Sequence, residues 1–130
     1  MGNQGLTMRE DKEATDIILT DDCARKLRAM DDAMYILNGK WKIPILARLC
    51  YKPMRYSELL KDIRGISGKM LSTELRELKA NGLIKREVLV ARPLRVRYAL
   101  SEYGHTLKQL TDNISDWGLQ HRHKIIQSLK

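Results

Sequence analysis

The stretch of sequence that decides the fold is RYSELLKDIRGISGKMLSTELRELKANGLIKREVLVARPLRVRYAL, residues 55–100. Its first half predicts two short helices joined by a tight turn, and its second half predicts a two-stranded ribbon. The second helix carries two sets of residues, each at the i, i+3/i+4, i+7 spacing of one helical face. The apolar set is Leu71, Leu75 and Leu78, and the opposite set is Lys69, Ser72, Thr73 and Arg76. We therefore expect one buried face and one face of basic and hydroxyl side chains.

The polar face of this helix suits the major groove of DNA. Arg and Lys can reach guanine edges there, while Ser and Thr can reach bases or phosphates. The candidate DNA-binding residues of the helix are its expected cap, Ser67, followed by Lys69, Ser72, Thr73 and Arg76. The alternative interpretation is a solvated helix face, which is the usual position of polar residues.

The ribbon that follows is basic. Residues 83–90 are rich in β-forming side chains, residues 91–94 contain a turn with a proline, and residues 95–100 alternate strictly. This period predicts a half-buried strand, with Val96, Tyr98 and Leu100 inward and Arg95, Arg97 and Ala99 outward. Arg92, Arg95 and Arg97 are candidate contacts to phosphates or to the minor groove. Alternatively, their charges protect an edge strand against aggregation.

Two longer helices are expected on either side of this segment. The first, residues 21–38, would be capped by Thr20 and end at Asn38 and Gly39, and the last would begin at Ser101. Both carry apolar residues at spacings of three and four, as in a coiled coil. The stripes are Cys23, Leu27, Met30, Met34 and Leu37 in the first helix, and Leu107, Leu110, Ile114, Trp117, His121 and Ile125 in the last. They offer more apolar surface than one small core needs and predict a homodimer through these helices.

Two shorter helices complete the predicted elements. Residues 41–51 form one of them, with Pro44 tolerated because it falls in the first turn. Its expected buried face is Ile43, Leu46, Ala47 and Cys50. Residues 58–63 form the other, with Ser57 as its cap.

The positive charge of the chain is confined to one segment. The 130 residues have a formal net charge of +8, but residues 1–39 carry 5 basic and 8 acidic side chains, a net −3. Residues 40–100 carry 15 basic and 5 acidic side chains, a net +10, and residues 101–130 are close to neutral. Charge concentrated on one module indicates a polyanionic partner.

Length and composition narrow the class of protein further. A chain of 130 residues suits a single core, and we expect a flexible N-terminal tail over residues 1–20 and one domain over residues 21–130. No apolar run is long enough to cross a bilayer, and the polar N-terminus lacks a signal sequence, so a cytoplasmic location and no membrane partner are expected. The two cysteines form no disulfide framework. Catalytic, metal-binding and cofactor-binding motifs are lacking, so no enzyme, metal or cofactor is expected.

A helix-turn-helix followed by a hairpin is a winged helix, so the predicted fold is mainly α with a small β-hairpin, a winged helix-turn-helix flanked by N- and C-terminal dimerisation helices. The motifs in chain order are GKW (39–41), RYSEL (55–59), GISGKML (65–71), LREL (75–78), NGL (81–83) and VRYALSEYG (96–104). In this order they resemble the HxlR-type transcriptional regulators, bacterial winged-helix proteins related to the MarR type. The resemblance covers about residues 37–117. It implies a homodimeric, sequence-specific regulator that binds double-stranded DNA, with a recognition helix beginning at Ser67 and a wing at residues 83–100. Repression is the expected outcome.

Two positions depart from the pattern of that family. The wing of the family usually has an acidic residue where this chain has Arg97. The family's frequent redox-sensing cysteine lies closer to the GKW motif than Cys23 does, near Arg28. Cys23 is the candidate redox residue, and the alternative is packing within the apolar stripe. An unidentified small-molecule or redox effector is therefore expected as a further partner.

A second class of function remains open on the sequence. A winged helix can also bind RNA or a protein partner without sequence-specific recognition of DNA. RNA binders use exposed aromatic side chains for stacking, and only 5% of these residues are aromatic. Binding of duplex DNA against single-stranded RNA at two salt concentrations discriminates between the classes.

Overall fold

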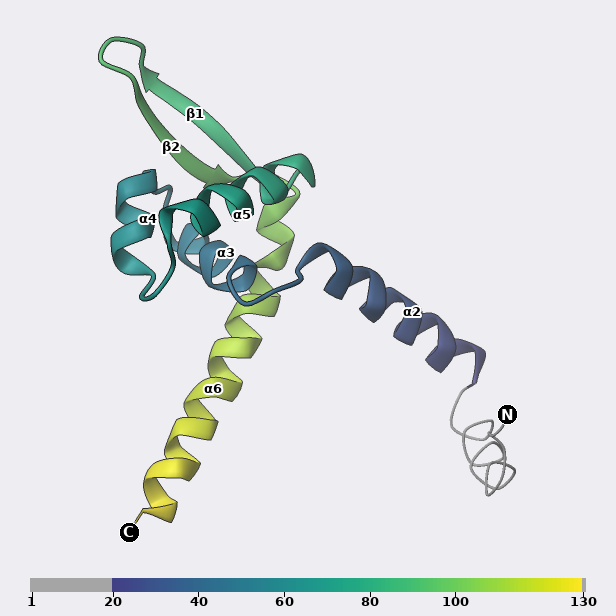
Figure 1. The fold of residues 1–130 in the computed structure, drawn as a ribbon. Coiled ribbons are helices and arrows are strands. Elements are labelled where there is room, and N and C mark those ends of the chain that lie inside the picture. The colour runs from purple at the N-terminus through teal and green to yellow at the C-terminus, as the bar shows by residue number, and fades with distance from the viewer. Residues whose placement is uncertain (1–19, 130) are drawn as a thin grey trace. The chain divides into compact units, whose positions relative to one another are not determined.

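The computed structural model describes residues 20–129, so almost all of the predicted tail at residues 1–20 lies outside the described residues. The elements are α2 (Asp21–Ile36), α3 (Lys42–Tyr51), α4 (Tyr56–Asp62), α5 (Gly68–Ala80), β1 (Ile84–Val90), β2 (Arg95–Leu100), the short 3-10 helix η1 (Gly104–Leu107) and α6 (Lys108–Ser128). This order confirms the predicted class, mainly α with one β-hairpin (Figure 1). The chain divides into two units between Asn38 and Gly39. The first contributes α2, and the second holds every other described element.

The first unit consists, over its described residues, of α2 and its caps. The hydroxyl of Thr20 accepts a hydrogen bond from the backbone N–H of Cys23 at 3.1 Å, which confirms the predicted N-cap. At the other end the side-chain amide of Asn38 donates to the carbonyl oxygen of Tyr35 at 2.7 Å. The helix ends at Ile36, slightly before the predicted end, and Gly39 follows with a φ of 83°.

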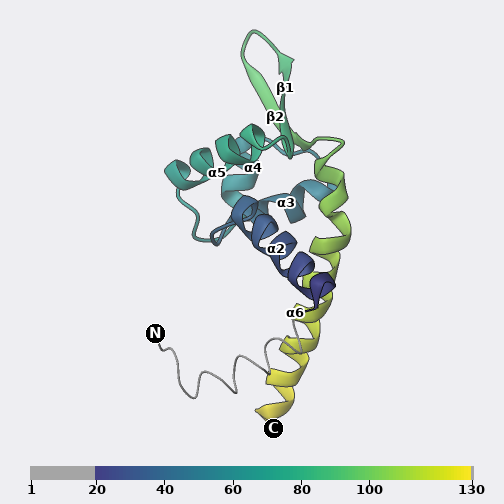
Figure 2. The same ribbon diagram turned by 90° about the vertical axis from the view of Figure 1, so that its right-hand side faces the viewer.

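The core of the second unit is formed by α3, α4 and α5. Leu71, Leu75 and Leu78 are all buried, so the predicted apolar face of α5 is confirmed. They are joined in the core by Ile45, Leu46, Leu49, Leu59 and Ile63. The hairpin and α6 extend away from this core in both views (Figures 1 and 2).

The buried face of α3 differs from the prediction. Of the four residues expected there, only Leu46 is buried, whereas Ile43, Ala47 and Cys50 are half-buried. The core-facing residues are Lys42, Ile45, Leu46 and Leu49. The helix is rotated in this way because its other flank packs on α6, where the sulfur of Cys50 lies 3.6 Å from the hydroxyl of Thr111.

The start of α4 also differs from the prediction. The helix begins at Tyr56 with Arg55 as its N-cap, so Ser57 lies inside the first turn and is not the cap. The backbone N–H of Arg55 donates to a carboxylate oxygen of Glu58 at 2.8 Å, and this bond closes the first turn earlier than expected. In α5 the prediction is confirmed, because the hydroxyl of Ser67 accepts from the N–H of Met70 at 3.0 Å.

The hairpin is a two-stranded antiparallel sheet. Arg86 pairs with Tyr98 and Glu87 pairs with Arg97 across the ladder. At the base of the hairpin, Met54 forms an additional bridge with Tyr98 and α3 packs against β2. Ala99 is therefore buried, with 7% of its surface exposed, and its predicted outward position is wrong. The alternation holds only where one side of the ribbon faces solvent.

The last helix starts later than predicted. Ser101 is followed by η1, and α6 begins only at Lys108. The hydroxyl of Ser101 accepts a hydrogen bond from the N–H of Gly104 at 2.8 Å and donates to the carbonyl oxygen of Gly82 at 2.5 Å. A Cβ at Gly104 would lie 2.0 Å from the carbonyl oxygen of Leu83, so only glycine fits this close approach.

Candidate nucleic-acid interface

The exposed face of α5 holds the predicted recognition residues. Lys69, Ser72 and Arg76 are exposed, and Thr73 is half-buried. Two of the hydroxyls are oriented by hydrogen bonds, because Ser72 donates to the phenol oxygen of Tyr56 at 3.2 Å and Thr73 donates to the carbonyl oxygen of Lys69 at 3.0 Å. The structure thus brings the polar set together on one face, with the hydroxyl oxygens still able to accept further hydrogen bonds.

Tyr56 anchors the first turn of α5 from the neighbouring helix. Its hydroxyl donates to the carbonyl oxygen of Gly68 at 2.7 Å and receives the hydroxyl of Ser72. A Cβ at Gly68 would lie 3.0 Å from the phenol oxygen, so a side chain there would push the tyrosine away. Neither the hydrogen bonding of Tyr56 to α5 nor the need for a glycine at position 68 was predicted from the sequence.

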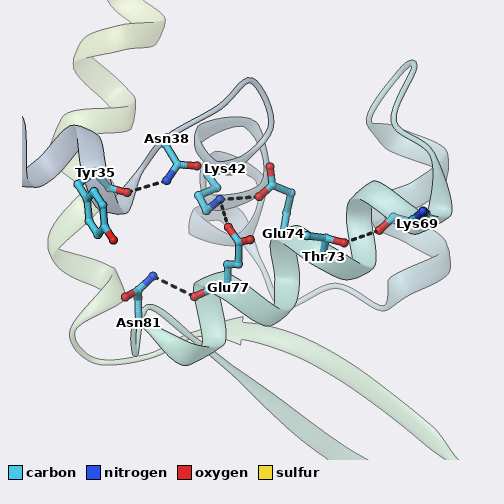
Figure 3. A network of polar contacts seen from close by, with 8 residues as sticks. All are labelled: Tyr35, Asn38, Lys42, Lys69, Thr73, Glu74, Glu77 and Asn81. Atoms are coloured by element: carbon cyan, nitrogen blue, oxygen red, sulfur yellow. Dashed lines mark hydrogen bonds and ion pairs between the residues drawn. The ribbon is translucent and has the colours of Figure 1, made fainter.

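The opposite face of α5 is held by a buried lysine (Figure 3). The ammonium group of Lys42 donates to Glu74 at 2.5 Å and to Glu77 at 2.6 Å. The side chains of Lys42 and Glu74 are only 1% and 7% exposed, whereas that of Glu77 is half-exposed. Burial acts to lower the pKa of Lys42, but the hydrogen bonds to the two carboxylates outweigh it and the pKa is raised. The position of α5 is therefore fixed on its buried side by these ion pairs as well as by packing.

Sequence analysis did not single out Glu74, which is buried in the structure. The sequence does contain a signal. Glu74 stands three residues after Leu71 and four before Leu78, which places it on the apolar face of the helix. An acid on that face needs a buried cationic partner, and Lys42 is the only lysine within the apolar run at residues 41–51.

The arginines of the hairpin fall into two groups. Arg92 and Arg95 are exposed and, within residues 20–129, take part in no ion pair. Arg97 instead donates to a carboxylate oxygen of Glu87 at 2.7 Å, and Lys85 lies 3.3 Å from the other oxygen. The hydrogen bond from Arg97 lowers the pKa of Glu87. Sequence reasoning overlooked this pair because the two residues meet only across the ladder.

The apolar stripes of α2 and α6 are largely exposed. Leu27, Met30 and Met34 of α2 have 44–58% of their surfaces exposed. On α6, Leu110, Ile114, Trp117 and Ile125 are exposed as well, and Trp117 stacks on His121 with ring centroids 5.2 Å apart. Each helix, taken separately, presents an apolar surface that is typical of an association site.

Cys23 is half-buried in the first turn of α2. The two nearest cations in the sequence, Arg25 and Lys26, could favour its thiolate, but both pair with Asp22, at 2.8 and 3.4 Å. Their charges are therefore partly compensated, and a redox role of Cys23 stays a prediction. Among the described residues no group of His, Cys, Asp and Glu is arranged to hold a metal ion. No helix over residues 20–129 is long and apolar enough to span a membrane.

Comparison with known proteins identifies the family. The HxlR-like helix-turn-helix model matches residues 36–125. Among curated relatives, the uncharacterized HTH-type transcriptional regulator YdzF of Bacillus subtilis (strain 168) is 41% identical over 98 residues, which are 75% of this chain and 90% of YdzF. Among solved structures, the HTH-type transcriptional regulator YtcD matches with a TM-score of 0.69 and 39% identity, over 72% of this chain and 96% of that chain. The redox regulator HypR in its reduced form matches with a TM-score of 0.70 and 30% identity, over 77% and 98%.

These matches extend over the helix-turn-helix, the hairpin and most of α6, and they confirm the resemblance seen in the sequence motifs. The neighbouring structures are winged-helix regulators, and the proteins that share the family are transcriptional regulators, not enzymes. The chain is accordingly a helix-turn-helix transcriptional regulator that belongs to the HxlR-like family.

Proposed function

We propose that this regulator binds double-stranded DNA sequence-specifically as a homodimer and acts as a repressor. One observation carries the proposal. The exposed face of α5 gathers Lys69, Ser72 and Arg76, while its buried face is held in place by Lys42 and the leucines. A rigid helix with such a face is suited to read base edges in the major groove.

The other candidate residues would support this helix. Ser67 and Thr73 flank the reading face, and each offers a hydroxyl close to the groove wall. Arg92 and Arg95, which have no carboxylate partner within residues 20–129, would contact phosphates or the minor groove. Arg97 has a smaller role in the proposal because Glu87 already holds its guanidinium.

The proposed dimer rests on the exposed stripes of α2 and α6. A symmetric dimer through these helices, with residues 21–130 acting as one domain, would bury both stripes. It would also place two recognition helices roughly 34 Å apart, on successive major-groove faces. The proposed site of action is the cytoplasm, where a bacterial regulator meets its DNA, and the effector would be an unidentified small molecule or a redox change.

The test is a comparison of ligands for the purified protein. A duplex is first enriched from fragments of the source genome, and its affinity is then compared with that of a random duplex and of a single-stranded RNA at two salt concentrations. We expect the enriched duplex to bind most tightly and to retain its advantage at the higher salt concentration. Equal affinity for both duplexes, or a preference for RNA, would contradict the proposal. Transcription from the enriched fragment in vitro, with and without protein, tests repression.

The RNA alternative has little support from the site. Base stacking requires exposed aromatic rings, and the tyrosines nearest to the reading face, Tyr56 and Tyr98, are both half-buried. Tyr56 is further occupied by its hydrogen bonds to α5.

A further inference from the structure

A cavity of about 230 Å³ lies between α5 and the base of the hairpin and is open to solvent. Its walls are Leu75 of α5 together with Tyr56 and Tyr98, and its charged lining comes from Arg76, Lys79 and Arg86. No carboxylate lines it. Since a water molecule takes up about 30 Å³, the cavity has room for a group considerably larger than one water.

The three cations of the cavity have no carboxylate partner within residues 20–129. Glu87 is engaged by Lys85 and Arg97, and successive residues of a strand point to opposite faces. Arg86 therefore lies on the other face of β1, opposite Tyr98, where nothing compensates its charge. On one face of the hairpin a carboxylate pairs with two cations, whereas the other face directs a cation without a carboxylate partner toward α5.

The place of the cavity along α5 indicates what it faces. Arg76, which is proposed to read a base, lies in the middle of α5, whereas Lys79 lies in the last turn, next to the hairpin. Cations at that end of the helix are placed to meet the sugar-phosphate backbone that borders the major groove. The pairing of a guanidinium with an ammonium group suits a phosphate, which accepts hydrogen bonds on several oxygens.

We infer that this cavity binds one backbone phosphate of the DNA in each protomer, with Lys79 and Arg86 as its ligands. Arg76 lines the cavity on the side of the reading face, and its guanidinium remains available for a base. The inference rests on the proposed function, and it adds two phosphate ligands, from the last turn of α5 and from β1, that fix the angle between the recognition helix and the wing on the duplex. Such ligands position the protein and carry no sequence information themselves.

The experiment compares two neighbouring residues of β1. Arg86→Gln removes a charge from the cavity, whereas Lys85→Gln removes an equal charge from the opposite face of the same strand. The affinity for the enriched duplex is measured over a range of salt concentrations. For Arg86→Gln we expect the slope of log affinity against log salt to fall by about 0.9 for each phosphate that the variant no longer neutralises. For Lys85→Gln we expect the wild-type slope. Thermal denaturation of both variants checks that they fold.

A phosphate-ethylation interference experiment locates the phosphate. In wild type, ethylation of one particular phosphate in each half-site should block binding. In Arg86→Gln and in Lys79→Gln, the interference at that phosphate should disappear while the other interference sites remain.

The outcomes distinguish a failure of the phosphate site from a failure of the proposed function. If wild type prefers the enriched duplex but Arg86→Gln has a parallel salt slope and an unchanged interference pattern, the phosphate site is wrong and the proposed function stands. If wild type binds every duplex alike, the proposed function is wrong, and the salt slopes of Arg86→Gln and Lys85→Gln on a random duplex still decide the phosphate site. If Lys85→Gln lowers the slope as much as Arg86→Gln, the effect belongs to general charge and the cavity has no special role.

Discussion

Lys42 and Glu74 form an ion pair inside the protein, 2.5 Å apart, with 1% and 7% of their side chains exposed. The pair joins the first turn of α3 to the middle of the recognition helix across 32 positions of sequence. Because both groups lose their hydration, each depends on the other to remain charged in the interior. The position of the proposed DNA-reading face is therefore coupled to a single ammonium group on the buried side of α5.

Removing one member of this pair should be strongly destabilising. Lys42→Met leaves the Glu74 carboxylate buried without its main partner, and we expect the free energy of unfolding to fall by about 3–5 kcal/mol. The double variant Lys42→Met/Glu74→Leu should recover most of that stability, because both charges leave the interior. Chemical denaturation measures both. The control is Lys40→Met: Lys40 is exposed, with its ammonium 4.8 Å from the Trp41 ring centroid, so its removal should cost less than about 1 kcal/mol.

The same pair predicts a dependence of stability on alkaline pH. The pKa of Lys42 is raised above its ordinary value of 10.5 in the folded state. Its contribution to stability is therefore complete below the unfolded pKa and disappears as the pH rises through the higher folded pKa. In chemical denaturation from pH 8 upward, wild type should lose stability relative to the double variant once the pH exceeds the ordinary lysine pKa of 10.5. A constant gap would contradict a raised pKa of Lys42.

The wing arginines should differ in their effect on DNA binding. Neutralising Arg92 and Arg95 together should lower the salt slope of operator binding by about 0.9 for each phosphate that is left without its cation, with the site preference largely unchanged. Arg97→Gln should change the slope much less, because its guanidinium is already bound to Glu87. Conversely, Glu87→Gln releases Arg97 and should steepen the slope. Parallel slopes for wild type and the Arg92/Arg95 variant would mean that the wing is a protected edge that does not touch DNA.

Arg76 and Lys69 should contribute in different ways. Arg76 lies in the middle of α5 and can form a bidentate contact with guanine, typically worth about 1–3 kcal/mol of discrimination. Lys69 lies in the first turn, where contact with a phosphate is expected and carries no sequence preference. Arg76→Ala should thus weaken operator binding more than binding to random DNA, and Lys69→Ala should weaken both alike. Equal weakening on the two duplexes for Arg76→Ala would exclude it from base reading.

The proposed dimer predicts a residue-specific change of mass. Sedimentation at micromolar concentration should give twice the 15.1 kDa of one chain for wild type. Ile114 is 46% exposed within the apolar stripe of α6, and Ile114→Asp should shift the protein to the monomer because burial of a charge opposes association. Ser115→Asp, at the next and likewise exposed position, is the matched control and should leave the dimer intact. A wild-type protein of 15.1 kDa at these concentrations would rule out the dimer.

Features that depend on residues within about one helical turn were predictable from the sequence. The caps at Thr20 and Ser67 are confirmed because a hydroxyl three residues before a free N–H satisfies it wherever the helix lies. The apolar face of α5 is confirmed for the same reason, since helical periodicity alone places its leucines together. At Arg55 two local signals competed. The hydroxyl of Ser57 suggested a cap, but the carboxylate of Glu58 reaches back to the earlier residue and the helix begins there.

Features that depend on distant partners were not predictable in this way. The burial of Ala99 follows from the bridge between Met54 and Tyr98, which a strand pattern does not contain. The pairing of Arg97 with Glu87 follows from the register of the hairpin. The candidate site shows the same division. The polar residues of α5 were predicted from their spacing. In contrast, Tyr56, Lys79 and Arg86 were recognised as part of the site only from the structure, in which α4, α5 and the hairpin surround one cavity.

The hydrogen bonds of Ser101 have a consequence for the operators that this regulator can use. Its hydroxyl links Gly82, just after the recognition helix, to Gly104, just before α6, and the close approach of Gly104 to Leu83 leaves no slack at that point. The helix proposed to read DNA, the hairpin and the helix proposed to form the dimer are thus joined at one point. In the proposed dimer, the distance between the two recognition helices could therefore change only if α6 changed its orientation. Such a protein should accept only a narrow range of distances between half-sites, and a change of that distance in evolution would have to arise in the helix that touches no DNA.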